Sequence, residues 1–131
     1  MTREYGFEKL RVWKIAVEFT SSIYKLTNDF PAHELYGIKS QIRRACVSIG
    51  CNLAEGTSRT SYKEQARFSS ISYSSLMEVL NLLIISHQLN YLPENQYLKL
   101  RTQIEELSNG INALRNSQLN SSKTNSKHLN F

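Results

Sequence analysis

The chain has 131 residues, about the length of one ordinary domain, and 40% of them are hydrophobic. That share supports one packed core, so the composition excludes a wholly disordered chain, and the length leaves little room for a second core. The 16 lysines and arginines outnumber the 11 acidic residues and give a formal net charge of +5, which permits contact with phosphate backbones without requiring it.

The sequence shows no pattern typical of export or membrane insertion. Residues 1–14 contain no apolar stretch of the kind found in secretory signals. The most apolar stretch, residues 76–85, contains Glu78 and Asn81 and is far shorter than the roughly 20 residues that span a bilayer. Cys46 and Cys51 lie roughly 140° apart on one expected helix, so we expect two free thiols in the core of a cytoplasmic protein.

The first predicted helix covers residues 7–28. The 5 glycines and 2 prolines signal few turns, which favours long helices over a many-stranded sheet. Apolar residues recur at three-and-four spacing, and a second stripe widens the apolar face. Pro31 ends the helix, because the residue before a proline is disfavoured in the α conformation. The main stripe is Val12, Ile15 or Ala16, Phe19, Ile23 and Leu26, and the second stripe is Leu10, Trp13 and Val17.

The second predicted helix covers residues 33–55. Its apolar side consists of Leu35, Ile38, Ile42, Ala45 or Cys46, Ile49 and Leu53. Gly56 stands where a glycine just beyond the last turn would close the helix. Gly50, inside the helix, costs about 1 kcal/mol relative to alanine, which indicates a bend or a close backbone contact there.

The third predicted helix begins at Ser61 and continues to about Leu89. Ser61 and Glu64 form a capping-box pattern, in which each side chain satisfies a free backbone N–H at the helix start. The later stretch LMEVLNLLII is apolar at most positions, so we expect it to be buried on two sides. We expect one side to face the bundle core and the other to meet another subunit.

The fourth predicted helix starts near Pro93, which suits a first helical turn. An apolar seam follows at 3-4-3-4-3 spacing, formed by Tyr97, Leu100, Ile104, Leu107, Ile111 and Leu114. Short loops between helices of similar length favour antiparallel neighbours. The sequence therefore predicts an all-α, antiparallel up-down-up-down four-helix bundle over residues 1–117, followed by a disordered polar tail over residues 118–131.

No catalytic motif is present. The sequence has no P-loop, dinucleotide-binding glycine pattern, HExxH or paired-cysteine zinc spacing. His33, His87 and His128 are isolated from one another, and none has the Glu-x-x-His spacing of di-iron bundles. We therefore expect a protein that is not an enzyme, with no catalytic residue, no metal and no cofactor.

Four positions are expected to serve structure or a subunit interface: Trp13, Asn52, Glu55 and Gly56. Asn52 and Glu55 lie three residues apart and so share one face at the end of the second helix. They fit either a polar site or subunit contact, or a buried hydrogen-bond network that ties the helix end to the next loop. Both interpretations stay open at this point.

Five basic residues are the candidate nucleic-acid ligands: Arg43, Arg44, Arg59, Lys63 and Arg67. If the second and third helices pack antiparallel, these side chains can converge around the loop between the helices. Tyr62 and Tyr73 then offer stacking surfaces for unpaired bases. The alternative is a solvated face on which Glu34, Glu55 and Glu64 are the partners of these cations.

Three stretches resemble a known family: FEKLRVWKIAVEF, LTNDFPAHELYGIKSQIRRACVSIGCNLAEGTSR and YKEQARFSSISYSSLMEVLNLL. Together they resemble the S23-type four-helix bundle proteins, which are encoded in intervening sequences of bacterial 23S ribosomal RNA genes. The pattern RRAxxSIxxNxAEG, from Arg43 to Gly56, is the most specific part. The chain departs from the family at Gly50, where relatives usually have proline, and at Ser74, where they usually have glycine.

The resemblance implies an antiparallel four-helix protomer that forms a homopentamer. It also extends to accessory bundle proteins of diversity-generating retroelements, which work with a reverse transcriptase and its RNA. We therefore expect a non-enzymatic, oligomeric protein that binds nucleic acid, structured RNA in particular. The alternative is a protein-interaction scaffold that docks a polymerase such as a reverse transcriptase.

Overall fold

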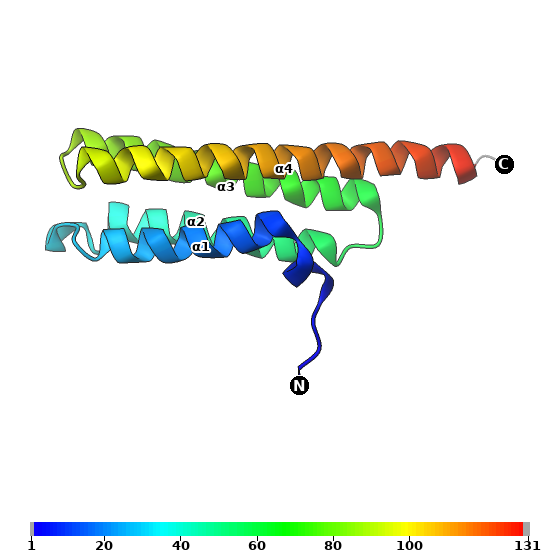
Figure 1. Cartoon of the computed structure of the whole chain (residues 1–131), viewed down its shortest axis with the longest axis horizontal. Coiled ribbons are helices and arrows are strands. Elements are labelled where there is room, and N and C mark those ends of the chain that lie inside the picture. Colours follow the sequence, from blue (N-terminus) through cyan, green and yellow to red (C-terminus); the bar gives the residue numbers. More distant parts are fainter. Residues whose placement is uncertain (1, 130–131) are drawn as a thin grey trace.

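The computed structural model describes the backbone of residues 2–129 and the side chains of residues 2–123. Four α-helices and two short 3-10 helices make up the fold, in the order η1 (Gly6–Lys9), α1 (Arg11–Thr27), η2 (Ala32–Glu34), α2 (Ile38–Thr57), α3 (Tyr62–Gln88) and α4 (Glu94–Leu129). Helices α1 and α2 form one layer and α3 and α4 the other (Figure 1). The predicted all-α antiparallel four-helix bundle is confirmed, and residues 2–129 contain no strand.

The core lies along the axis between the four helices. The seam predicted for the fourth helix is buried from Tyr97 to Ile111, and Leu114 packs against its end. In α1, Val12, Ala16, Phe19 and Ile23 are buried, as their spacing predicted. Helix α3 makes extensive contacts with both α2 and α4, whereas α1 meets mainly α2. The bundle is therefore held chiefly through α3.

Two predicted helix starts are displaced. Leu10 has an extended backbone (φ −70°, ψ 122°), which separates η1 from α1, so the first long helix begins at Arg11. The second begins at Ile38, and the carboxylate of Glu34 accepts a hydrogen bond from the Ile38 backbone N–H at 3.3 Å. Leu35, expected in the core, therefore precedes the helix and is exposed.

Gly56 does not close α2. The helix continues to Thr57, and Gly56 is buried inside it. A Cβ atom at Gly56 would lie 2.7 Å from the Cβ of Phe68 on α3, closer than atoms can pack. Glycine is required because α2 and α3 approach each other closely here. At Gly50, by contrast, a Cβ would meet the indole nitrogen of Trp13 at an ordinary 3.9 Å, so no close backbone contact explains that glycine.

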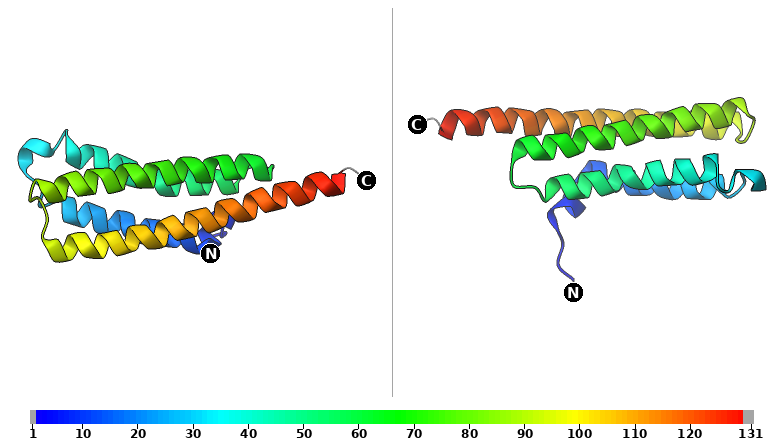
Figure 2. Two further views of the ribbon diagram at one scale, coloured as in Figure 1. Left: turned by 90° about the horizontal axis from the view of Figure 1, so that it is seen from above. Right: turned by 180° about the vertical axis from the view of Figure 1, so that it is seen from behind.

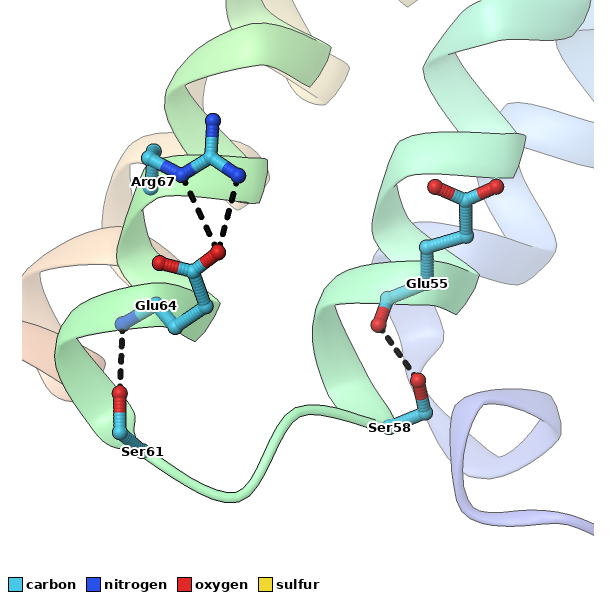
Figure 3. A network of polar contacts seen from close by, with 5 residues as sticks. All are labelled: Glu55, Ser58, Ser61, Glu64 and Arg67. Atoms are coloured by element: carbon cyan, nitrogen blue, oxygen red, sulfur yellow. Dashed lines mark hydrogen bonds and ion pairs between the residues drawn. The ribbon is translucent and has the colours of Figure 1, made fainter.

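Helix α3 begins as predicted, with Ser61 as its N-cap. The Ser61 hydroxyl accepts a hydrogen bond from the Glu64 backbone N–H at 3.0 Å. The Glu64 carboxylate does not return the bond, because it accepts two hydrogen bonds from the Arg67 guanidinium instead (Figure 3). Half of the predicted capping box is thus present.

Helix α4 continues well past Ser117, where the sequence predicted the start of a disordered tail. Gln118 is buried, and its side-chain oxygen accepts a hydrogen bond from the Ser69 hydroxyl of α3 at 2.7 Å. Ala66 and Ser69 of α3 are themselves buried. The end of α4 projects beyond the other helices in Figures 1 and 2. Residues 130 and 131 of the expected tail lie outside the described residues.

Helix α3 is long and apolar enough to cross a membrane, with a mean hydropathy of 1.4 over its most apolar 18-residue window. In the bundle, 39% of that window is buried, and α3 contacts both α2 and α4. Its second half was expected to be apolar on two sides. Leu76, Val79, Leu82 and Leu83 are indeed buried in the bundle, while Ile84 and Ile85 are exposed.

Cys46 and Cys51 are both free, as predicted, but they differ in environment. Cys46 is buried in the core, whereas Cys51 is exposed, so the expectation of two core thiols is wrong for Cys51. The angular offset that prevents a disulfide also turns the second thiol away from the core.

Candidate nucleic-acid interface

The register between α2 and α3 separates the five predicted basic ligands into two groups. The Ser72 hydroxyl donates to the Ile49 carbonyl oxygen at 2.9 Å, which places residue 72 of α3 beside residue 49 of α2. Arg67 then lies near the level of residue 54, roughly 16 Å along the helix axis from Arg43 and Arg44 at 1.5 Å per residue. The expected convergence around one corner does not occur.

The first group, called the loop group here, consists of Arg59, Lys63 and Arg67 around the connection between α2 and α3. The Arg67 guanidinium lies 2.8 Å from the Glu64 carboxylate, and Glu55 is exposed on the neighbouring helix end (Figure 3). The hydrogen bond from Arg67 lowers the pKa of the Glu64 carboxyl below its usual value. Glu64 is thus the ion-pair partner of Arg67, whereas Glu55 forms no ion pair with any described residue.

The two arginines of the loop group also have an intramolecular stacking partner. The guanidinium groups of Arg59 and Arg67 lie over the ring of Phe68, at 4.7 Å and 5.0 Å from its centroid. Tyr62 is exposed at the start of α3, whereas Tyr73 lies half-buried in a groove between α3 and α4, away from these cations. The ion pair between Arg67 and Glu64 agrees with the alternative of a solvated face with acidic partners. The assignment of Arg59, Lys63 and Arg67 to nucleic acid stays a prediction.

Arg43 is held in place by the end of α1. Its Nε donates to the Thr27 hydroxyl at 2.8 Å, and Nη2 donates to the Tyr24 carbonyl oxygen and the Asn28 side-chain oxygen, both at 3.0 Å. The guanidinium also lies 4.5 Å from the centroid of the Tyr24 ring. Arg43 thus fastens α2 to the last turn of α1, where backbone carbonyls lack helical partners.

Beside Arg43 lies an open hollow of about 510 Å³ on the α1–α2 layer. We call it the cationic hollow, because Lys39, Arg43 and Arg44 line it and none of its lining residues is acidic. Glu34 precedes it in the chain, but its carboxylate accepts a hydrogen bond from the Tyr91 hydroxyl at 2.7 Å, which lowers the pKa of Glu34. The other lining residues are Tyr24, Leu35, Tyr36, Ser40 and Val47.

Sequence reasoning missed Tyr24, Tyr36 and Lys39 as possible site residues. A signal was nevertheless present, because Tyr36, Lys39, Arg43 and Val47 recur at three-and-four spacing and so share one side of the chain as it enters α2. That stripe mixes aromatic, aliphatic and cationic side chains. A search for purely apolar stripes passes over such a pattern.

The residues expected to serve structure fall into different roles. The ring of Trp13 packs edge-on against Phe7 at 5.0 Å and holds η1 against the bundle.

Asn52 donates from Nδ2 to the carbonyl oxygen and the hydroxyl of Ser48, at 2.9 Å and 3.0 Å, and the Ser48 and Ser75 hydroxyls are 2.9 Å apart. Asn52 therefore belongs to a polar network, as one alternative proposed. That network links α2 to α3, not the helix end to the loop, and the exposed Glu55 is not part of it.

Two histidines contact tyrosines from other parts of the chain. The His87 ring stacks on Tyr97 with centroids 3.9 Å apart, and its Nε2 contacts the Glu94 carboxylate. His33 Nε2 lies 3.4 Å from the Tyr91 hydroxyl. Within the part of the chain that the structure describes, no group of three or more His, Cys, Asp or Glu side chains could hold a metal ion.

These features define an all-α four-helix bundle protein with a cationic hollow on its α1–α2 layer. The family model of the 23S rRNA-intervening sequence protein matches residues 8–113, and the chain belongs to this family. The fold is similar to the crystal structure of a protein of unknown function from the S23 ribosomal protein family of Bacteroides thetaiotaomicron. The TM-score is 0.71 at 20% identity, and the match covers 79% of this chain and 97% of that one.

A short similarity to a much larger protein also exists. The chain is 36% identical over 72 residues to the kinesin-like protein KIN-14T of Arabidopsis thaliana. The match covers 55% of this chain but only 8% of that protein.

Proposed function

We propose that this chain is a non-enzymatic, cytoplasmic nucleic-acid-binding protein that contacts structured RNA through the cationic hollow. The observation that carries the proposal is the presence of Lys39, Arg43 and Arg44 around one hollow without a lining carboxylate. Clustered cations attract phosphate backbones by releasing condensed counterions. Membership in a family named for a 23S rRNA intervening sequence makes RNA the first ligand to test.

Assembly of several copies would strengthen this interaction. One chain has a net charge of only +5 and presents three cations at the hollow. A symmetric ring, such as the homopentamer that we propose, repeats the hollow around its axis and multiplies the number of phosphate contacts. The exposed Ile84 and Ile85 on α3 provide apolar surface for such an assembly.

The test is binding of the purified protein to an RNA hairpin and to duplex DNA across a salt series, with mass determined by light scattering. We expect affinity to fall log-linearly with salt, and Lys39→Glu and Arg44→Glu each to weaken RNA binding. Lys63→Glu, a single charge reversal in the loop group, is the matched control. Absence of binding at low salt by a well-formed oligomer would contradict the proposal. If Lys63→Glu weakened RNA binding as much as Lys39→Glu and Arg44→Glu do, the cationic hollow would not be the specific RNA-binding site.

A second candidate function is a scaffold that docks a protein such as a polymerase. It is favoured by the groove between α3 and α4, which Tyr73, Met77, Leu80 and Leu98 line and in which Leu98 is 54% exposed. Pull-down from native cells after nuclease treatment separates the two functions. A protein partner that persists without nucleic acid, and that is lost on Leu98→Glu, would favour the scaffold.

A further inference from the structure

We infer that the cationic hollow binds unpaired nucleotides and stacks a base on Tyr36; this inference rests on the proposed nucleic-acid function and specifies its ligand. Tyr36 is 91% exposed, and three more large side chains around the same hollow are also exposed. Single exposed apolar residues are ordinary on protein surfaces, but four around one hollow form a patch. The three besides Tyr36 are Leu35, Val47 and Tyr24, whose side chains are 48%, 42% and 39% exposed.

The two tyrosines of the hollow differ in what their rings already contact. The Tyr24 ring is covered by the Arg43 guanidinium at 4.5 Å, and three hydrogen bonds hold that guanidinium in place. Among residues 2–123, no aromatic ring and no cationic group stacks on the Tyr36 ring. The ring of Tyr36 is therefore free to stack with a base.

Two cations line the same hollow as Tyr36. Lys39 follows Tyr36 by three residues, and Arg44 lies roughly 7–8 Å further along α2 at 1.5 Å per residue. Arg44 is exposed and Lys39 is half-buried, and the described side chains include no ion-pair partner for either cation. Lys39 and Arg44 can thus contact different phosphates of one strand while its base lies on Tyr36.

This combination favours unpaired segments over a duplex. Bases inside a duplex are stacked on their neighbours and present mainly phosphates, for which a basic surface alone is sufficient. A free aromatic ring contributes only when a base is splayed out, as in loops, bulges and single strands. In the loop group, by contrast, Arg59 and Arg67 lie over Phe68, which is itself buried.

The experiment compares a uridine 10-mer with a fully paired RNA duplex by fluorescence anisotropy, using the full chain. We expect Tyr36→Ala to weaken binding of the uridine strand roughly 5- to 100-fold and to leave duplex binding unchanged. Tyr36→Trp should retain strand binding, because indole also stacks. Tyr5→Ala is the matched control, since Tyr5 is 56% exposed and lies beside an arginine, Arg3, at 5.1 Å. Thermal unfolding checks that each variant is folded.

The outcomes separate this inference from the proposed function. If Lys39→Glu and Arg44→Glu abolish binding while Tyr36→Ala leaves strand binding unchanged, the unpaired-nucleotide inference is overturned and the proposed function stands. If neither RNA binds the wild-type protein, both are overturned. If polyglutamate displaces the uridine strand as well as unlabelled RNA does, and Tyr36→Ala does not alter this, the hollow is a general anion surface and the inference also fails.

Discussion

The Arg43 Nε donates a hydrogen bond to the Thr27 hydroxyl at 2.8 Å and so joins the second turn of α2 to the last residue of α1. Thr27 is completely buried and donates its own hydroxyl hydrogen to the Ile23 carbonyl oxygen at 2.8 Å. Arg43 and Arg44, adjacent in sequence, therefore have different roles. Arg43 belongs to the fold, and Arg44 faces solvent.

This difference predicts opposite consequences for two alanine substitutions. Arg43→Ala should lower the free energy of unfolding by about 1–3 kcal/mol, because the Thr27 oxygen loses a charged donor. Arg44→Ala should change it by less than about 0.5 kcal/mol. Urea denaturation of both variants measures the difference, and equal stabilities would show that the Arg43 contacts contribute nothing. A double charge reversal at both arginines would confound folding with binding, so Arg44 alone is the appropriate site for a binding test.

The two glycines of α2 should also respond oppositely to alanine. At Gly56 a Cβ would lie 2.7 Å from the Cβ of Phe68, so Gly56→Ala must push α2 and α3 apart and should destabilise the bundle by about 1–3 kcal/mol. At Gly50 the nearest atom to a Cβ is 3.9 Å away, so Gly50→Ala should stabilise the helix by up to about 1 kcal/mol. Thermal melting of the pair tests this. If Gly50→Ala lowered stability instead, close packing within one chain could not be the reason that glycine is required at this position.

Local patterns in the sequence were sufficient to predict four long helices and their buried faces, but not where the first two begin or where the fourth ends. The seam from Tyr97 to Ile111 is buried because apolar side chains at three-and-four spacing share one helix face, whatever their partners are. The cap at Ser61 was predictable for a similar reason, since the hydroxyl and the Glu64 N–H that it accepts from lie within one turn.

Contacts between distant parts of the chain were not predictable in this way. The hydrogen bond between Ser69 and Gln118 joins residues 49 apart, and no local signal marks Gln118 as buried. The separation of Arg43 from Arg67 depends on the register of α2 against α3, which the Ser72–Ile49 hydrogen bond reveals only in three dimensions. Gly56 was misread because a glycine after a helix and a glycine at a helix contact look alike in sequence.

The Ser69–Gln118 hydrogen bond predicts that residues after Ser117 contribute to stability. Gln118→Ala should lower the free energy of unfolding by about 1–3 kcal/mol, because it leaves the buried Ser69 hydroxyl without its acceptor. Asn116→Ala, at an exposed position two residues earlier, is the control and should change stability little. Equal stability of wild type and Gln118→Ala in urea denaturation would indicate that this part of α4 does not pack against α3 in solution.

The two cysteines should differ sharply in reactivity. Burial raises the pKa of the Cys46 thiol from 9.0 to about 11, and its hydrogen bond with Thr20 opposes this only in part. The thiolate is the reactive form, so at pH 8 a disulfide reagent should modify the exposed Cys51 rapidly and Cys46 only slowly. In denaturant both thiols should react quickly. Cys51→Ser should remove the fast phase, and a fast phase that persists in this variant would contradict the burial of Cys46.

The raised pKa also sets the direction of a pH effect on stability. The folded state keeps the Cys46 proton up to about pH 11, whereas the unfolded thiol releases it near its usual value of 9.0. Between these values the folded state binds more protons, so the contribution of Cys46 to the free energy of unfolding falls as pH rises. Comparison of wild type with Cys46→Ala by urea denaturation at pH 8 and pH 10 isolates this contribution. From pH 8 to pH 10 the wild type should lose stability relative to Cys46→Ala. If the difference in unfolding free energy between the two proteins stayed constant, Cys46 would have the same pKa in the folded and unfolded states.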